Sequence, residues 1–205
     1  MQGKLLDIGC GSKPYKDLFV HITEYIGIDV DTSGHDHKKE DIDLFFNGID
    51  IPFPDNYFDS LLCSEVLEHV ENLSVLLSEA NRVLRPGGKF LVTTPFVWNE
   101  HEMPYDFLRF TQQGMRKLLD DSGFTVVEMH KSGTFSQVVA QLQMLYISSK
   151  LPEKNKFFKI LFNVLFVSPV TLIGLIKILF LPGDTSLYFN NIVFAQKQNS
   201  ESTLN

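Results

Sequence analysis

The 205-residue chain has little cysteine and no cluster of positive charge. Its two cysteines, Cys10 and Cys63, are too few for a disulfide scaffold, so we expect buried reduced thiols in a cytoplasmic protein. The formal net charge is -7 and the lysines and arginines are scattered, which argues against nucleic acid as a partner. Lys4 and Asp7 interrupt the start of the chain, so no cleavable signal peptide is expected there.

The interpretation depends most on residues 4–12, with the sequence KLLDIGCGS. An apolar run that ends in Gly9 and Gly11 is typical of a buried parallel strand that feeds a tight turn. In a doubly wound sheet a nucleotide-like ligand lies at the first such turn, although two glycines alone fit an ordinary strand-to-helix turn equally well. Tyr15 and Lys16 stand where the dinucleotide fingerprint has its third glycine, which argues against NAD and leaves a smaller adenosine ligand open.

A second short strand is expected at residues 25–29, and it ends in Asp29. The interval from Gly11 to Asp29 is close to the ~20 residues at which an acid reaches the ribose hydroxyls of a nucleotide. A carboxylate can accept hydrogen bonds from both hydroxyls. The alternative is a surface acid at the end of a strand.

With these segments in place, the chain resembles the class I S-adenosylmethionine-dependent methyltransferases, in particular their small-molecule and glycolipid-type branch. The matching segments cover residues 4 to about 130 in the family's order and spacing; each is loose alone, and the ordered set is specific. They are LLDIGCG (5–11), IGID (26–29), PFPDNYFD (52–59), CSEVLEHV (63–70) and LRPGGKF (84–90), with WNEHEMPYDFLRF (98–110) indicating the branch.

The resemblance implies a doubly wound α/β fold with a seven-stranded, mostly parallel sheet and an antiparallel last strand, the Rossmann-like methyltransferase fold. We expect the S-adenosylmethionine-binding core in residues 1–133, a hydrophobic helical insertion in 134–186, the last strand in 187–198 and a disordered tail in 199–205. Residues 12–21 are expected to form a short helix after the first turn.

The resemblance also implies S-adenosylmethionine as the cofactor. Asn47 stands where the family often has an acid beside the adenine; an amide can still hydrogen-bond an adenine edge. Ser64 follows the fourth strand and would lie beside the methionine moiety, and Asp29 would bind the ribose. The residues assigned to cofactor binding are Asp7, Gly9, Cys10, Gly11, Asp29, Asn47 and Ser64.

Few catalytic groups are required, because the cofactor supplies the electrophile and the protein mainly positions and desolvates. His101 follows the fifth strand and titrates near neutrality, so it is a candidate base for a hydroxyl acceptor. Oxygen is therefore the expected target atom, with nitrogen left open. The candidate catalytic residues are Glu65, His69, His101 and Tyr105.

Structural alternatives exist for several of these candidates. His69 can be an ordinary polar residue at the start of a helix, and Tyr105 can simply pack. Asp106 and Arg109, in the same loop, can form a structural pair. We interpret the run at residues 35–37 (HDH) as a solvated loop, and no metal site is expected.

Residues 157–181 are almost entirely apolar and long enough to cross a bilayer, which takes ~20 residues. The sixth strand precedes this run and the last strand follows it, so any crossings must be even in number. Pro169 divides the run into two halves that are each too short to span. We therefore predict a helical hairpin that lies in one leaflet or caps the acceptor pocket, with Lys159 and Lys177 at the interface. The alternative is a hydrophobic lid or a dimer interface.

Together these patterns predict a methyltransferase that acts on a small or lipid-linked acceptor, in the cytoplasm and at the inner face of the membrane if 157–181 contacts it. One alternative is a methyltransferase-like binding protein without activity. Another is a dehydrogenase with a similar sheet, which the missing third glycine and the region around Glu65 disfavour.

Overall fold

The computed structural model describes residues 1–31, 40–151, 156–181 and 183–199. The run at 35–37 and residues 200–205 of the expected tail lie outside this part of the chain. The chain divides into two compact units, Met1–His130 with Asn191–Asn205 and Lys131–Asn190. We call them the core unit and the helical unit.

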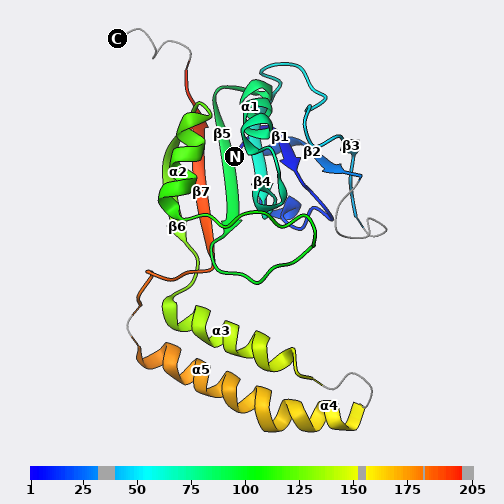
Figure 1. The fold of residues 1–205 in the computed structure, drawn as a ribbon. Coiled ribbons are helices and arrows are strands. Elements are labelled where there is room, and N and C mark those ends of the chain that lie inside the picture. Colours follow the sequence, from blue (N-terminus) through cyan, green and yellow to red (C-terminus); the bar gives the residue numbers. More distant parts are fainter. Residues whose placement is uncertain (32–39, 152–155, 182, 200–205) are drawn as a thin grey trace. The chain divides into compact units, whose positions relative to one another are not determined.

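The core unit contains a seven-stranded sheet in the order β3-β2-β1-β4-β5-β7-β6 (Figure 1). Strands β1, β2, β3, β4 and β5 pair in parallel, so that Leu6 of β1 lies between Ile26 of β2 and Leu61 of β4. β7 runs antiparallel to β5, which confirms the predicted fold. The strands are β1 (Gly3–Ile8), β2 (Ile22–Val30), β3 (Leu44–Phe46), β4 (Phe58–Ser64), β5 (Leu84–Pro95), β6 (Phe124–Lys131) and β7 (Asn190–Lys197).

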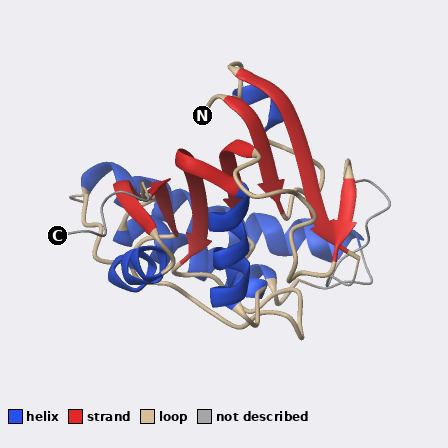
Figure 2. Cartoon of the chain, turned by 90° about the horizontal axis from the view of Figure 1, so that it is seen from above, coloured by secondary structure: helices blue, strands red, loops and turns tan. Residues whose placement is uncertain are grey.

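Two helices cover one face of this sheet, α1 (Leu73–Val83) and α2 (Gln112–Asp121) (Figures 1 and 2). They share a face because β4 to β5 and β5 to β6 are connections that advance in the same direction across the sheet. The predicted cap of α2 is present: Thr111 Oγ1 accepts a hydrogen bond from Gly114 N at 3.1 Å.

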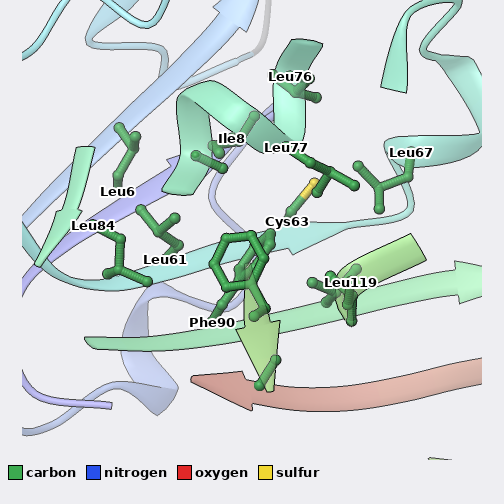
Figure 3. Close-up of a cluster of buried hydrophobic side chains, with 14 of the residues drawn as sticks. Leu6, Ile8, Leu61, Cys63, Leu67, Leu76, Leu77, Leu84, Phe90 and Leu119 are labelled. Carbon is green, nitrogen blue, oxygen red and sulfur yellow. The ribbon is translucent and has the colours of Figure 1, made fainter. Parts of the chain in front are cut away.

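The hydrophobic core lies between these helices and the sheet (Figure 3). Leu76 and Leu77 of α1 and Leu119 of α2 point toward the sheet residues Cys63 and Phe90, and all five are at most 2% exposed. Full burial of such an apolar side chain stabilises the fold by about 1.5–3 kcal/mol. This packing fixes β4 and β5, whose carboxyl ends carry several of the predicted site residues.

The short helix predicted for residues 12–21 is wrong. Only Lys16–Leu18 forms a single 3-10 turn. Lys13 adopts a left-handed backbone conformation with φ of 53°, which interrupts any helix begun at Ser12. Its side chain is buried and bonds to Asp43, so a tertiary contact takes precedence over helix formation in this short connection.

The helical unit is a pair of packed helices. It contains α3 (Phe135–Ser148), followed by α4 (Lys156–Phe162), a π-helical segment (Asn163–Val167) and α5 (Ser168–Phe180), which run on without a break. Gly174 of α5 packs against α3, because a Cβ added there would lie 3.0 Å from the Cβ of Ala140. By length and composition alone, Phe157–Phe180 is the one helix in the described part of the chain that passes as a membrane span.

The structure also corrects the prediction that Pro169 divides this apolar run. Proline lacks an N–H and its ring collides with the carbonyl four residues earlier. A π-helical segment ends just before α5, and Ser168 N donates to Asn163 O, five residues earlier, so the helix is wider where it meets the proline. The run is therefore one helix of 24 residues, and the hairpin forms between α3 and α5 instead.

The helical unit begins and ends at two adjacent strand ends. Ser132 N donates to Asn190 O at 2.9 Å, and Phe189 N donates to Ser132 O at 2.8 Å. Such a pair of antiparallel strand ends has the geometry of a β-hairpin that a two-residue turn can close. A short turn would be enough to connect β6 to β7, and the helical unit is inserted in place of that turn.

This geometry predicts that the core unit folds without the helical unit. A variant in which an Asn-Gly turn joins Ser132 directly to Phe189 is expected to be soluble and to unfold cooperatively, because the buried core of Figure 3 lies entirely in the core unit. Circular dichroism with thermal unfolding measures this. A variant that aggregates, or that melts without a cooperative transition, would contradict the prediction.

Candidate active site

Two adjoining cavities of about 390 and 300 Å³ open at the carboxyl ends of β1, β2 and β4. In open parallel sheets, ligands bind at this edge. Because the two cavities share much of their lining, they form one crevice. The shared residues are Gly9, Asp29, Val30, Val66, His69 and Glu102.

The turn after β1 requires glycine at its first position. Gly9 has φ of +70°, and an added Cβ would lie 2.3 Å from Val66 Cγ2. The backbone N–H groups of Gly9 and Cys10 both donate to Ile28 O, at 2.8 and 3.1 Å. The turn is thus drawn onto β2, and its backbone lines the floor of the crevice.

The carboxylate of Asp29 ties the end of β2 to this turn. Its Oδ2 accepts from Gly11 N at 3.0 Å and its Oδ1 accepts from Val30 N at 2.8 Å. Asp29 is only 7% exposed, yet it lines both cavities. Each carboxylate oxygen offers about two lone pairs, so both retain capacity for a ligand hydroxyl.

Asp7 is a second buried acid in the crevice. Tyr25 Oη donates to Asp7 Oδ2 at 2.5 Å. Burial raises the pKa of Asp7 to about 7, and the nearby charge of Asp29 acts in the same direction. Burial likewise raises the pKa of the Cys10 thiol to about 12, so Cys10 is a neutral packing residue of the turn. The role of Tyr25 was not predicted, because only the register of β1 on β2 reveals its contact.

Lys13 is a buried cation that the sequence patterns did not indicate. Its Nζ lies 2.6 Å from Asp43 Oδ2, which also accepts from Gly27 N at 2.7 Å. A Cβ on Gly27 would lie 2.4 Å from Lys13 Cε, so the lysine stem fills the space that this glycine leaves. Lys13 therefore fixes the first turn to the β2–β3 connection.

Asn47 lines the second cavity, but most of its amide is engaged locally. Its Oδ1 accepts from Ile49 N and Asp50 N at 2.9 and 2.7 Å, and its Nδ2 donates to Asp50 Oδ2 at 2.9 Å. The second hydrogen of Asn47 Nδ2 takes part in none of these bonds and can donate to a ligand. Asn47 thus builds the turn that walls the cavity.

Ser64 and Glu65, at the end of β4, both line the first cavity. Ser64 Oγ lies 2.8 Å from Thr93 Oγ1, and Glu65 N donates to Thr93 O at 3.0 Å. Glu65 has φ of 55°, a conformation that is uncommon outside glycine and clusters at functional sites. Its Oε1 is buried, with no hydrogen-bond partner among the described residues.

His69 lines both cavities, and its tautomer follows from its contact with Tyr105. His69 Nδ1 lies 2.7 Å from Tyr105 O. A carbonyl oxygen can only accept, so Nδ1 carries the proton and Nε2 keeps its lone pair. Tyr105 thus contributes a carbonyl that orients His69 as well as a wall of the second cavity.

His101 lies outside the lining of these two cavities, with its ring edge-on to that of His69 at 4.7 Å between centroids. Its backbone N donates to Asp106 Oδ2 at 3.0 Å. Arg109 makes a bidentate pair with Asp106 at 2.6 and 2.7 Å and holds the pKa of that carboxyl well below its usual value. Asp106 and Arg109 therefore form a structural pair, which was the alternative interpretation. The backbone bond to Asp106 holds His101 beside this pair.

Glu68 lies beside this histidine pair and was not among the candidate site residues. It is fully buried, and burial raises its pKa to about 8. Neither carboxylate oxygen has a hydrogen-bond partner in the described part of the chain.

The structure brings together most of the predicted site residues. His101 does not line the crevice, but its ring contacts that of His69, which does. The predicted residues that line the first cavity are Asp7, Gly9, Cys10, Gly11, Asp29, Ser64, Glu65 and His69, and those that line the second include Asn47 and Tyr105.

Comparison with known proteins gives a family match over residues 6–92, to the family described as "Methyltransferase domain". A probable S-adenosylmethionine-dependent methyltransferase of Mycolicibacterium smegmatis is 34% identical over 96 residues, which are 44% of this chain and 37% of that protein. A fatty-acid O-methyltransferase of the same organism is 34% identical over 103 residues, which are 45% of this chain and 38% of that protein. The chain thus spans less than two fifths of the length of these two relatives.

Solved structures share the fold. Phosphoethanolamine N-methyltransferase 2 of Haemonchus contortus, in complex with S-adenosyl-L-methionine, superposes with a TM-score of 0.56 at 17% identity. The superposition covers 97% of this chain and 50% of that protein. At this level of identity the likeness supports the architecture of the sheet and not the choice of acceptor.

The raised pKa of Asp7 predicts how stability depends on pH. The folded protein keeps this proton up to about pH 7, whereas the unfolded chain loses it near pH 4, so stability is lost as the pH rises between these values. We expect the free energy of unfolding of the wild type, relative to Asp7→Asn, to fall by up to about 1.4 kcal/mol per pH unit from pH 5 to 7. Urea unfolding at several pH values measures this.

Asp120→Asn serves as the control, because Asp120 is exposed on α2 and this change should leave the pH dependence as it is. Parallel curves for the wild type and Asp7→Asn would show that Asp7 is ionised throughout.

Proposed function

We propose that this chain, whose residues 6–92 belong to the class I S-adenosylmethionine-dependent methyltransferases, binds S-adenosylmethionine in the crevice and methylates a small or lipid-linked acceptor on oxygen. The observation that supports this best is the joining of Asp29 to the glycine turn by the Gly11 N–H. This bond places the Asp29 carboxylate, which can accept further hydrogen bonds, beside the exposed backbone of the glycine turn. Such an arrangement suits a ribose next to a methionine chain.

The two cavities fit the two ends of this cofactor. The first holds Asp7, whose charged form a neighbouring cation favours, so it suits the methionine end with its ammonium and sulfonium groups. The second has apolar walls that include Ile49 and Leu76, with the remaining amide hydrogen of Asn47 at the edge, and suits the adenine. Asp29 lines both and would take the ribose between them.

S-adenosylmethionine supplies the electrophilic methyl group, so this chain has to position the acceptor and exclude water. Methylation on oxygen also requires that the hydroxyl lose its proton. We assign the acceptor side to the histidine pair, because His69 lines both cavities and its Nε2 is free of the Tyr105 contact. Glu65 and Tyr105 would form the walls around it, with His101 behind His69.

The helical unit supports an apolar or lipid-linked acceptor. Only 6% of the apolar window in Phe157–Phe180 is buried, and Leu179 and Phe180 are 79% and 82% exposed. One relative is named a fatty-acid O-methyltransferase. We therefore propose a peripheral contact of residues 157–181 with the inner face of the membrane. The buried free thiols Cys10 and Cys63 agree with the cytoplasm as the compartment.

A contact along the membrane surface fits the helical unit better than a crossing. The helix of 24 residues is about 36 Å long, which exceeds the ~30 Å hydrocarbon core. However, β6 and β7 belong to one sheet, so a second crossing would be needed. α3 has 14 residues and spans about 21 Å, too short for that crossing.

Cofactor binding can be tested by calorimetry with S-adenosylmethionine and the variant Asp29→Ala. Losing two hydrogen bonds to a charged acceptor, at roughly 1.5–3 kcal/mol each, is expected to weaken binding at least about tenfold. Asp29→Asn keeps one acceptor oxygen, and its affinity is expected to lie between those of the wild type and Asp29→Ala. Asp120→Ala, far from the crevice in sequence and exposed, should bind as the wild type does.

Equal affinity in a folded Asp29→Ala protein would remove Asp29 from the cofactor site. Binding of S-adenosylmethionine without methyl transfer to any hydroxyl-bearing lipid or small molecule would instead favour the inactive binding protein.

The membrane contact can be tested by flotation with vesicles of anionic phospholipid. The native protein is expected to float, and Leu179→Glu combined with Phe180→Glu is expected to reduce the bound fraction about tenfold or more, since each buried apolar side chain is worth about 1.5–3 kcal/mol. Leu18→Glu with Val20→Glu is the matched control, because these residues are 73% and 78% exposed in the core unit. Native protein that stays in solution and is monodisperse without detergent would contradict the proposal.

A further inference from the structure

We propose that Glu68, His69 and His101 form a binding site for a divalent transition-metal ion such as Zn²⁺, beside the crevice. Each of the three offers one ligand atom, and these atoms all lie within 4.8 Å of one another. The proposal goes beyond the methyltransferase function, and ion binding is measured without cofactor or acceptor. The two proposals can therefore fail independently. With an ion bound, His69 Nε2 would be a ligand and would not accept the acceptor's proton.

Glu68 is the observation that points to a cation. Its side chain is fully buried, and both carboxylate oxygens lack a hydrogen-bond partner among the described residues. Burying a carboxylate is costly unless it is paired or coordinates a metal. Its Oε1 faces the pair of histidines, 3.7 Å from His69 Nε2. A cation between these atoms would place a positive charge in direct contact with the carboxylate, whereas Arg109 acts on it only through its charge and makes no hydrogen bond to it.

His69 is oriented as a metal ligand would be. A ligating histidine usually donates its other ring N–H to a carbonyl or carboxylate, which fixes the tautomer and aims the free nitrogen at the ion. His69 Nδ1 makes such a contact with Tyr105 O at 2.7 Å. Its Nε2 lone pair is thereby directed toward Glu68 and Glu102, whose Oε2 lies 3.8 Å away.

His101 has a carboxylate beside its ring. Its Nδ1 lies 3.2 Å from Asp106 Oδ2, and the bidentate pair with Arg109 holds Asp106 in place. The contact does not meet hydrogen-bond geometry, and Nδ1 is buried without a hydrogen-bond partner among the described residues, so a ring nitrogen of His101 is left for the ion. The His101 and His69 rings lie at 76° to each other with centroids 4.7 Å apart, so they approach the cluster from different directions.

The backbone holds the two halves of the site together. Glu68 and His69 stand on a 3-10 turn after β4, whereas His101 stands on the loop after β5. Phe107 N and Leu108 N both donate to Glu68 O, at 2.8 and 3.3 Å, which fastens this loop to the turn. The ligands are thus preorganised by main-chain bonds.

One carboxylate and two imidazoles are a ligand set that catalytic zinc sites use, with a further position open. Zinc bonds of about 2.0–2.2 Å place tetrahedral ligand atoms roughly 3.4 Å apart. The 3.7 Å between Glu68 Oε1 and His69 Nε2 needs to shorten by only a few tenths of an ångström. Since His69 and Glu102 line both cavities, the remaining position would face the crevice.

The experiment is calorimetric titration of the full chain with Zn²⁺, together with the visible absorption of the Co²⁺ form and metal content after dialysis. We expect one ion per chain. Glu68→Gln, His69→Gln and His101→Gln should each weaken binding at least about tenfold, as removal of even an outer-shell partner typically costs about 10–100-fold. His130→Gln is the control, because His130 is an exposed histidine of β6.

Circular dichroism establishes that each variant is folded before titration. A native protein that binds no Zn²⁺ at micromolar concentration would overturn the proposal. So would binding that persists in the His69→Gln and His101→Gln double variant, since the ion would then lie elsewhere on the chain. Loss of binding in Glu68→Gln with unchanged thermal stability of the metal-free protein would support a direct ligand.

Discussion

The crevice depends on one buried carboxylate that joins two elements. Asp29 accepts from Gly11 N and from Val30 N, so the end of β2 and the turn after β1 cannot move independently. Gly9 makes this approach feasible, because any side chain there would collide with Val66 from the segment after β4. Three parallel strands thereby converge on a single floor. The cofactor proposal follows from this floor more than from any single residue that lines it.

The architecture could be predicted because local patterns dictate it. β1 and β2 are apolar runs that lead into Gly9 and Asp29, and α2 begins at its Thr111 cap. The ordered motifs resemble the methyltransferases, and a family described as "Methyltransferase domain" matches residues 6–92. The residues that were missed act through distant partners. Lys13 is defined by Asp43 and Tyr25 by Asp7, and no periodicity in the chain reveals either contact. The roles assigned to the lining residues remain predictions, although the structure brings most of them together.

Pro169 shows how a local rule fails in a particular context. A proline inside a helical run is normally a reason to end the helix, and this argument predicted two short halves. A π-helical segment lies directly before the turn that holds the proline, and the helix continues through it. The argument against a membrane crossing then no longer depends on the apolar helix itself. It depends on α3, which is too short to return the chain to the sheet.

The crevice is rich in acidic side chains, and this connects the two proposed ligands. Asp7, Asp29, Glu65 and Glu68 all lie buried or half-buried in or beside it. The charge of Asp29 helps to raise the pKa of Asp7, and the charge of Glu65 helps to raise that of Glu68. Lys13, the buried cation nearby, is already held by Asp43. Carboxylates buried at this density are stabilised by cations. The sulfonium and ammonium groups of the cofactor would neutralise Asp7 and Asp29 at the glycine turn. A metal ion would neutralise Glu68 beside the histidine pair.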